Sequence, residues 1–135
     1  MPHYSAKALD HFRRPRNVGV IEDADAVGSV SNPQCGDTMK LYLRIREGRV
    51  AGARWQARGC SASIAAGSAA SELITGQTIE GARALTRGAI VEALDGLPPS
   101  KAHGALLAVD AIREALRRYE ATRPGDAPGA AQAPP

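Results

Sequence analysis

The sequence predicts an α+β domain, in which a three-stranded antiparallel sheet is covered by helices. Period-two alternation of apolar side chains is confined to the first half of the chain, and helical patterns fill the second half. Strands grouped ahead of helices indicate an α+β fold, whereas parallel sheets need the two in alternation. The 135 residues suit a single core. We therefore predict one domain over residues 1–120 and a disordered tail, rich in Pro, Gly and Ala, over residues 121–135.

The first helix and the first strand are expected near the N-terminus. Apolar side chains, among them Ala8 and Phe12, recur at helical spacing on one face of residues 4–14. Pro15 ends this helix, because proline lacks a backbone N–H and its ring clashes with the preceding turn. A short strand is expected over residues 27–30.

A β-hairpin is expected in the middle of the chain. Residues 39–45 alternate apolar with polar or charged side chains, which is typical of a strand with one buried face. The Glu-Gly-Arg sequence at residues 47–49 suits a tight turn, and the chain then returns along residues 50–57. Gly52 indicates an irregularity in the returning strand.

Four helices are expected after the hairpin. Residues 61–75 are rich in Ala and Ser, and such small side chains allow a helix to lie close to another backbone. Two short helices follow, with candidate N-caps at Thr78 and Thr86. The last helix is expected over residues 100–120 with Ser100 as its N-cap, because its apolar positions form one stripe at spacings of three and four.

Composition excludes several classes of protein. The net charge is only +3, from 17 basic and 14 acidic residues, and no basic stripe interleaved with aromatic residues indicates nucleic-acid binding. No apolar run approaches the roughly 20 residues that span a bilayer, and no signal-peptide pattern opens the chain. We therefore expect a cytoplasmic protein that binds neither nucleic acid nor membrane. Dinucleotide-binding and P-loop glycine motifs are also missing from the sequence.

Cys35 and Asp37 form the first candidate site. They flank Gly36 where a turn enters a strand, and residues two apart in an extended backbone face the same side. A thiolate and a carboxylate that point into one space suit a metal ion. An ordinary turn with a buried cysteine is the alternative, because a free cysteine packs as a small apolar residue.

Cys60 and His103 form the second pair of candidates. Cys60 lies where a strand gives way to a helix, and the partial positive charge of a helix N-terminus favours a thiolate. His103 lies in the first turn of the last helix, beside its apolar stripe, where a neutral imidazole can bind a metal. A packed cysteine and a solvated histidine are the alternatives. Hairpin connectivity can bring both candidates to the same end of the sheet as Cys35 and Asp37.

Five segments in order resemble one known family over residues 3–120. The chain is similar to the scaffold proteins of iron–sulfur cluster assembly of the IscU, SufU and NifU N-terminal-domain type. The segments are PRNVG, NPQCGD, DTMKLYLRI, RGCSASIAAGSAASE and LPPSKAHGALLAVDAI. The resemblance implies an antiparallel three-stranded sheet that carries a helical layer, which agrees with the fold expected from periodicity.

The resemblance also implies an assembly site. In the family, three cysteines and an aspartate surround this site, and Cys35, Asp37 and Cys60 match three of the four. The third cysteine follows a histidine, whereas here His103 is followed by Gly104. The implied binding residues for a cofactor or metal are therefore Cys35, Asp37, Cys60 and His103. Four ligands suffice for tetrahedral iron or zinc, and Rieske centres show that a [2Fe-2S] cluster accepts two non-cysteine ligands.

The expected function is that of a non-catalytic scaffold or carrier, which binds iron or a transient [2Fe-2S] cluster and passes it to apo-proteins. The resemblance implies a cysteine desulfurase and apo iron–sulfur acceptor proteins as partners. It also implies an Hsp70-type chaperone, which would read the segment LPPSK between Leu97 and Lys101. The alternative is a degenerate relative that binds zinc or iron and docks on assembly partners without building clusters, because Gly104 cannot accept sulfur. A thiol redox enzyme and a hydrolase are weaker hypotheses.

Overall fold

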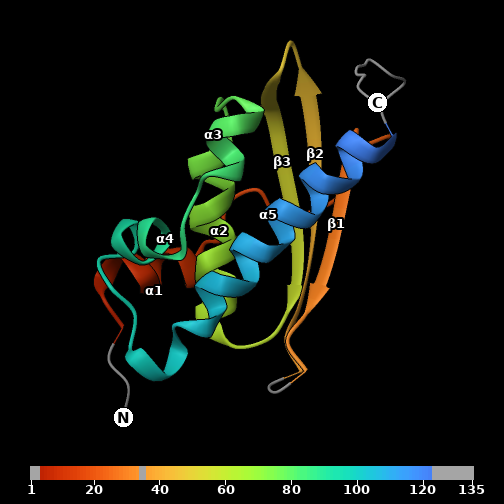
Figure 1. The fold of residues 1–135 in the computed structure, drawn as a ribbon. Coiled ribbons are helices and arrows are strands. Elements are labelled where there is room, and N and C mark those ends of the chain that lie inside the picture. The colour runs from red at the N-terminus through yellow and green to blue at the C-terminus, as the bar shows by residue number, and fades with distance from the viewer. Residues whose placement is uncertain (1–3, 34–35, 123–135) are drawn as a thin grey trace.

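The computed structural model describes residues 4–33 and 36–122 and confirms the predicted α+β class (Figure 1). One helix precedes three strands, and four helices follow them. In chain order the elements are α1 (Ala6–Arg13), β1 (Ala26–Ser31), β2 (Thr38–Arg46), β3 (Arg49–Arg58), α2 (Ser61–Ile74), α3 (Ile79–Arg83), α4 (Arg87–Ala93), a 3-10 turn (Pro99–Lys101) and α5 (His103–Thr122). The expected tail lies outside the described residues, except for the last two residues of α5.

The three strands form one antiparallel sheet in the order β1-β2-β3. Leu41 of β2 lies between Gly28 of β1 and Trp55 of β3, and all three face the helices. The register between β2 and β3 shifts opposite Gly52, so the irregularity expected there is confirmed. Met39, Leu41, Leu43 and Ile45 of β2 are buried, as the period-two pattern predicts for a sheet covered on one face, and Tyr42 between them is buried as well.

Helices α2 and α5 lie across the covered face of the sheet, and α1, α3 and α4 pack around them (Figure 1). Small residues permit this close packing. A Cβ atom built on Gly28 would lie 2.4 Å from the Ala111 carbonyl oxygen and 2.5 Å from the Ala115 nitrogen, so α5 rests directly on the backbone of β1. Within the described ranges, no helix is both long and apolar enough to cross a membrane.

Two details of the helices differ from the sequence-based expectations. Ser100 does not cap the last helix: it lies within the 3-10 turn that the Lys101 N–H closes on the Pro98 carbonyl, so α5 begins only at His103. Phe12, expected on the buried face of the first helix, is 39% exposed, and Ala8 is the buried residue of α1. The caps at Thr78 and Thr86 are confirmed, since each hydroxyl accepts a backbone N–H three residues later.

We predict that Gly28→Ala destabilises the fold by about 1–3 kcal/mol, the range typical of overpacked cores, because its Cβ would meet the backbone of α5. Urea denaturation measures the effect. Gly88→Ala is the matched control: its Cβ would meet only the Thr86 hydroxyl, at 3.9 Å, and alanine favours the α4 helix. Equal stabilities of the two variants would contradict the close approach of α5 to β1.

Candidate metal centre

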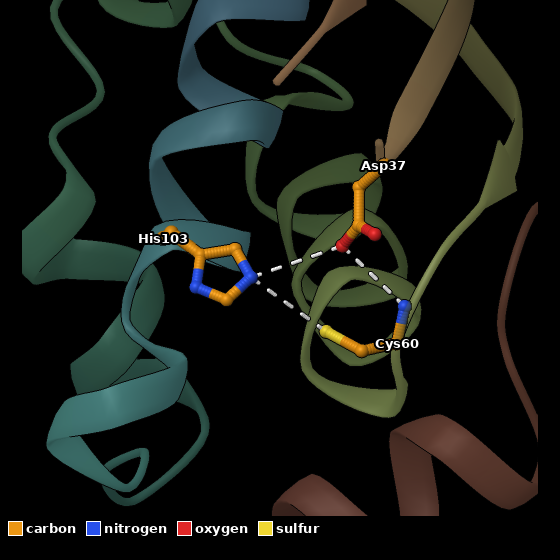
Figure 2. Close-up of side chains that lie close together, drawn as sticks. All are labelled: Asp37, Cys60 and His103. Atoms are coloured by element: carbon orange, nitrogen blue, oxygen red, sulfur yellow. Dashed lines mark hydrogen bonds and ion pairs between the residues drawn. The ribbon is translucent and has the colours of Figure 1, made fainter. Parts of the chain in front are cut away.

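Three side chains from separate parts of the chain converge beyond one end of the sheet (Figure 2). Asp37 immediately precedes β2, Cys60 is the N-cap of α2 directly after β3, and His103 is the first residue of α5. The hairpin brings Asp37 and Cys60 together because β2 begins where β3 ends. The packing of α5 adds His103. The sequence-based expectation that these three residues share one site agrees with this arrangement.

The three side chains are spaced as metal ligands could be. The Cys60 Sγ lies 3.9 Å from the His103 Nε2, and that nitrogen lies 3.8 Å from the Asp37 Oδ2. One ligand atom from each residue lies within 4.8 Å of the others. Ligand atoms around a tetrahedral zinc ion lie roughly 3.3–3.6 Å apart, given its usual bond lengths. The two distances to the His103 Nε2 exceed this spacing by only a few tenths of an ångström. The Cys60 sulfur and the Asp37 carboxylate, which lie within 4.8 Å of each other, would close by up to about 1 Å for all three atoms to share one ion.

The Asp37 carboxylate is the most buried of the three groups, and its surroundings hold it in place. The residue is only 7% exposed. Its Oδ2 accepts a hydrogen bond from the Ser63 hydroxyl at 2.7 Å and a longer one from the Cys60 N–H at 3.4 Å. Gly59 provides the necessary space, because a Cβ there would lie 2.6 Å from the Asp37 Cγ. A negative charge is also favoured at the N-terminus of α2.

Gly104, which stands where the family has its third cysteine, lies against the backbone of α2. A Cβ atom built on it would lie 2.8 Å from both the Ala62 carbonyl carbon and the Ser63 nitrogen. The first turn of α5 therefore touches the backbone of the first turn of α2. A cysteine at position 104 would require these two helices to separate, so the chain is packed around glycine there.

The remaining predicted ligand, Cys35, lies outside the described residues, and its assignment stays a prediction. The chain around it is closed by two backbone hydrogen bonds, from the Gly36 N–H to the Asn32 carbonyl and from the Asn32 N–H to the Asp37 carbonyl. Gly36 has a positive φ of 76°, which glycine adopts without strain. These two bonds hold Asp37 close to Asn32, just before the start of β2 and beside the site.

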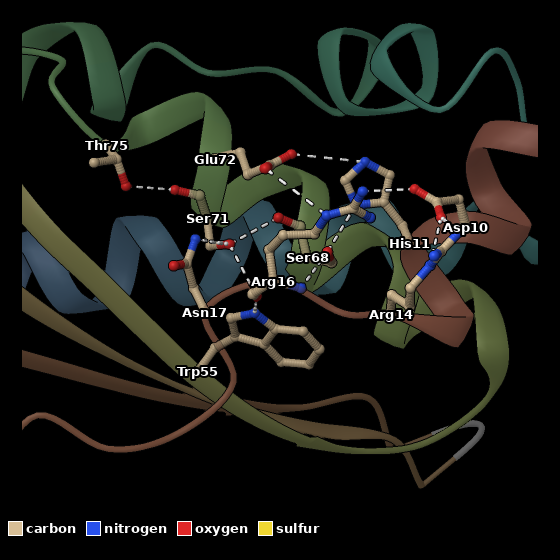
Figure 3. Close-up of polar contacts among 10 residues, drawn as sticks. All are labelled: Asp10, His11, Arg14, Arg16, Asn17, Trp55, Ser68, Ser71, Glu72 and Thr75. Atoms are coloured by element: carbon tan, nitrogen blue, oxygen red, sulfur yellow. Dashed lines mark hydrogen bonds and ion pairs between the residues drawn. The ribbon is translucent and has the colours of Figure 1, made fainter.

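A polar network on the other side of α2 was missed by the sequence analysis (Figure 3). The buried Ser68 hydroxyl accepts the Arg16 N–H at 2.9 Å and lies 2.7 Å from the His11 Nδ1. The Arg16 carbonyl accepts the indole N–H of Trp55 at 2.7 Å. These bonds fasten α1 and the following segment to α2 and β3. In the sequence, the spacing of Ser68 and Ser71 by three residues, on one face of a helix, could have indicated this network.

Burial and the nearby Arg16 guanidinium lower the pKa of His11, whereas Glu72 partly opposes them. The Ser68 hydroxyl is close enough to hydrogen-bond with the imidazole in its neutral form. His11, on α1, therefore belongs to the structural support of the N-terminal segment, and it contacts α2 at Ser68 rather than at the end where Cys60 lies.

The fold and the site together define a small α+β domain with a candidate metal centre at one end of its sheet. Residues 3–125 match the model of the NifU-like N terminal domain. The chain belongs to this family, and the predicted resemblance is confirmed.

Individual proteins are also similar to this chain in sequence. Over 116 residues the chain is 51% identical to the iron–sulfur cluster assembly scaffold protein IscU 1 of Archaeoglobus fulgidus, which covers 86% of this chain and 76% of that protein. Over 124 residues it is 40% identical to the iron–sulfur cluster assembly scaffold protein IscU of Escherichia coli K12, and the match covers 89% of this chain and 96% of that protein. The crystal structure of a NifU-like N-terminal protein from Brucella abortus has the same fold, with a TM-score of 0.72 at 21% identity over 88% of this chain and 95% of that one.

We predict that Gly104→Ala and Gly104→Cys each destabilise the protein by about 1–3 kcal/mol, because any Cβ at this position meets the backbone of α2. Chemical denaturation under reducing conditions measures both. A Gly104→Cys variant as stable as the wild type would show that the two helices have room for the missing thiol.

We also predict that stability falls as the pH drops below the unfolded-state pKa of histidine, near 6.5. The folded state lowers the pKa of His11, so in this window the unfolded chain binds more protons than the folded one, and acidification favours unfolding. His11→Asn, which retains a hydrogen-bonding group for Ser68, should weaken this dependence. Urea midpoints at pH 7.5 and 5.5 test this, and an unchanged pH dependence in the variant would count against it.

Proposed function

We propose that this chain is a scaffold in iron–sulfur cluster assembly, for which iron and sulfide are cargo that it passes to apo-proteins. The observation that carries the proposal is the convergence of Asp37, Cys60 and His103 beyond the sheet, in a chain 40–51% identical to proteins named as such scaffolds. The scaffold domain would cover residues 1–120. We expect it to act in the cytoplasm, where reducing conditions keep thiols free.

The donor set supports transient binding of iron. Thiolates of Cys60 and Cys35 would supply the soft ligands that iron–sulfur clusters use. Asp37 and His103 would complete the coordination with oxygen and nitrogen. Two non-cysteine ligands are compatible with a [2Fe-2S] cluster, as in Rieske centres. We expect Asp37 to keep the bound cargo exchangeable, because a carboxylate is a poor match for a soft cluster iron.

The partners follow from the same role. A cysteine desulfurase would supply sulfur, and apo iron–sulfur proteins would receive the cluster. An Hsp70-type chaperone would read the segment between Leu97 and Lys101. The position of this segment supports the last assignment: its 3-10 turn, with Pro99 and Ser100 exposed, directly precedes His103 at the site.

A second candidate function is favoured by the packing at Gly104. The chain would then bind zinc or single iron ions and dock on assembly partners without building clusters. Three donor atoms within 4.8 Å suit one tetrahedral ion as well as one iron of a cluster.

Anaerobic assembly with ferrous iron, cysteine, a cysteine desulfurase and a dithiol reductant, which reduces the delivered persulfide sulfur to sulfide, separates the two functions. The scaffold function predicts that stoichiometric iron and labile sulfide are bound and then move to an apo-ferredoxin. Cys60→Ala and His103→Ala should lose most of the bound cluster, because each removes a ligand. His11→Asn is the matched histidine control and should retain it. Metal without sulfide in the wild type would instead establish the second function.

A further inference from the structure

Ser63 is a serine in the first turn of α2 with no exposed surface. A buried hydroxyl costs free energy unless it is hydrogen-bonded, and a serine inside a helix commonly bonds back to a carbonyl of its own helix. Here the hydroxyl instead donates to the Oδ2 of Asp37, which is 26 residues away in sequence, at 2.7 Å. The Ser63 hydroxyl therefore links α2 to Asp37, on the other side of the site.

The accepting oxygen is the one that faces the other candidate ligands. The Asp37 Oδ2 lies 3.8 Å from the His103 Nε2 and accepts the Cys60 N–H. The Ser63 Oγ also lies 3.6 Å from the Cys60 Sγ. Each carboxylate oxygen has two lone pairs. Oδ2 accepts both the Ser63 hydroxyl and the Cys60 N–H, and the shorter of the two bonds, from Ser63, does most to fix the orientation of the carboxylate.

The geometry argues against Ser63 as a ligand itself. Two ligand oxygens on one tetrahedral ion lie roughly 3.3 Å apart, whereas the Ser63 Oγ and the Asp37 Oδ2 lie 2.7 Å apart. This separation is that of a hydrogen bond. A hydroxyl is also a poor partner for a soft metal site.

We propose that Ser63 is a positioning residue for metal binding, which holds the Asp37 carboxylate so that Oδ2 is directed toward the space shared with Cys60 and His103. This inference rests on the proposed function, since it requires that the site bind metal. Hydrogen bonds to ligating carboxylates typically strengthen metal binding, and their loss costs about 10–100-fold in affinity. The bond from Ser63 to Asp37 is a contact within the protein itself, so it preorganises the carboxylate.

Cobalt(II) is a suitable probe, because its visible absorption reports tetrahedral geometry and its near-ultraviolet absorption reports thiolate ligation. We expect Ser63→Ala to raise the Kd for cobalt about 10–100-fold and to weaken the tetrahedral bands. Ser61→Ala is the matched control: this serine is in the same helical turn, but its hydroxyl donates to the Tyr4 hydroxyl. Ser63→Thr keeps the hydroxyl and should keep most of the affinity, which provides a second variant if Ser63→Ala folds poorly.

A double-mutant cycle tests whether Ser63 acts through Asp37. In an Asp37→Ala background, Ser63→Ala should have little further effect on the cobalt Kd, because there is no carboxylate left to position. An undiminished effect in that background, or a Ser63→Ala variant that binds cobalt like the wild type and Ser61→Ala, would overturn the proposal. A wild-type protein that binds no cobalt would remove the proposed metal site as well, so the two failures are distinguishable.

Discussion

Helix α5 touches backbone directly at two points, and these contacts determine where the site forms. At Gly28 it rests on β1, and at its own Gly104 it rests on the first turn of α2. Protein interiors are close-packed, so a helix can shift only if its neighbours move. At a backbone-to-backbone contact there is no flexible side chain that could adjust to such a shift. Since His103 immediately precedes Gly104, the position of the helix fixes the position of the imidazole. The distance from His103 to Cys60 and Asp37 thus depends on two glycines.

The site offers a mixed set of donor atoms. The described residues provide one thiol, one carboxylate and one imidazole, and Cys35 adds a second thiol by sequence. A site with fewer thiolates and more oxygen and nitrogen donors binds iron and zinc without the strong preference of an all-cysteine site for clusters. Ser63 and Gly59 then hold the carboxylate in place, one by a hydrogen bond and the other by the space it leaves. The site therefore combines a mixed donor set with a fixed geometry.

Local signals in the sequence predicted much of this arrangement. Alternation placed the strands, hydroxyl caps placed the short helices, and the position of Cys60 between a strand and a helix placed it at the site. The start of α5 was predicted wrongly at Ser100, because a 3-10 turn and a helical turn share similar composition. The roles of Ser63 and Gly104 could not be predicted from spacing, since each depends on a contact between segments that are far apart in the chain. Family resemblance identified Gly104 as a departure, and the structure adds that α5 touches the backbone of α2 at this residue.

The central claim is that one metal ion, or one iron of a cluster, is shared by side chains from three elements of the fold. X-ray absorption at the iron edge of anaerobically loaded protein tests this most directly, with Cys60→Ala and His103→Ala measured beside the wild type. We expect a first shell of mixed sulfur and nitrogen or oxygen in the wild type, with sulfur scattering reduced in Cys60→Ala and the imidazole scattering lost in His103→Ala. An identical first shell in all three proteins would show that the iron is bound elsewhere.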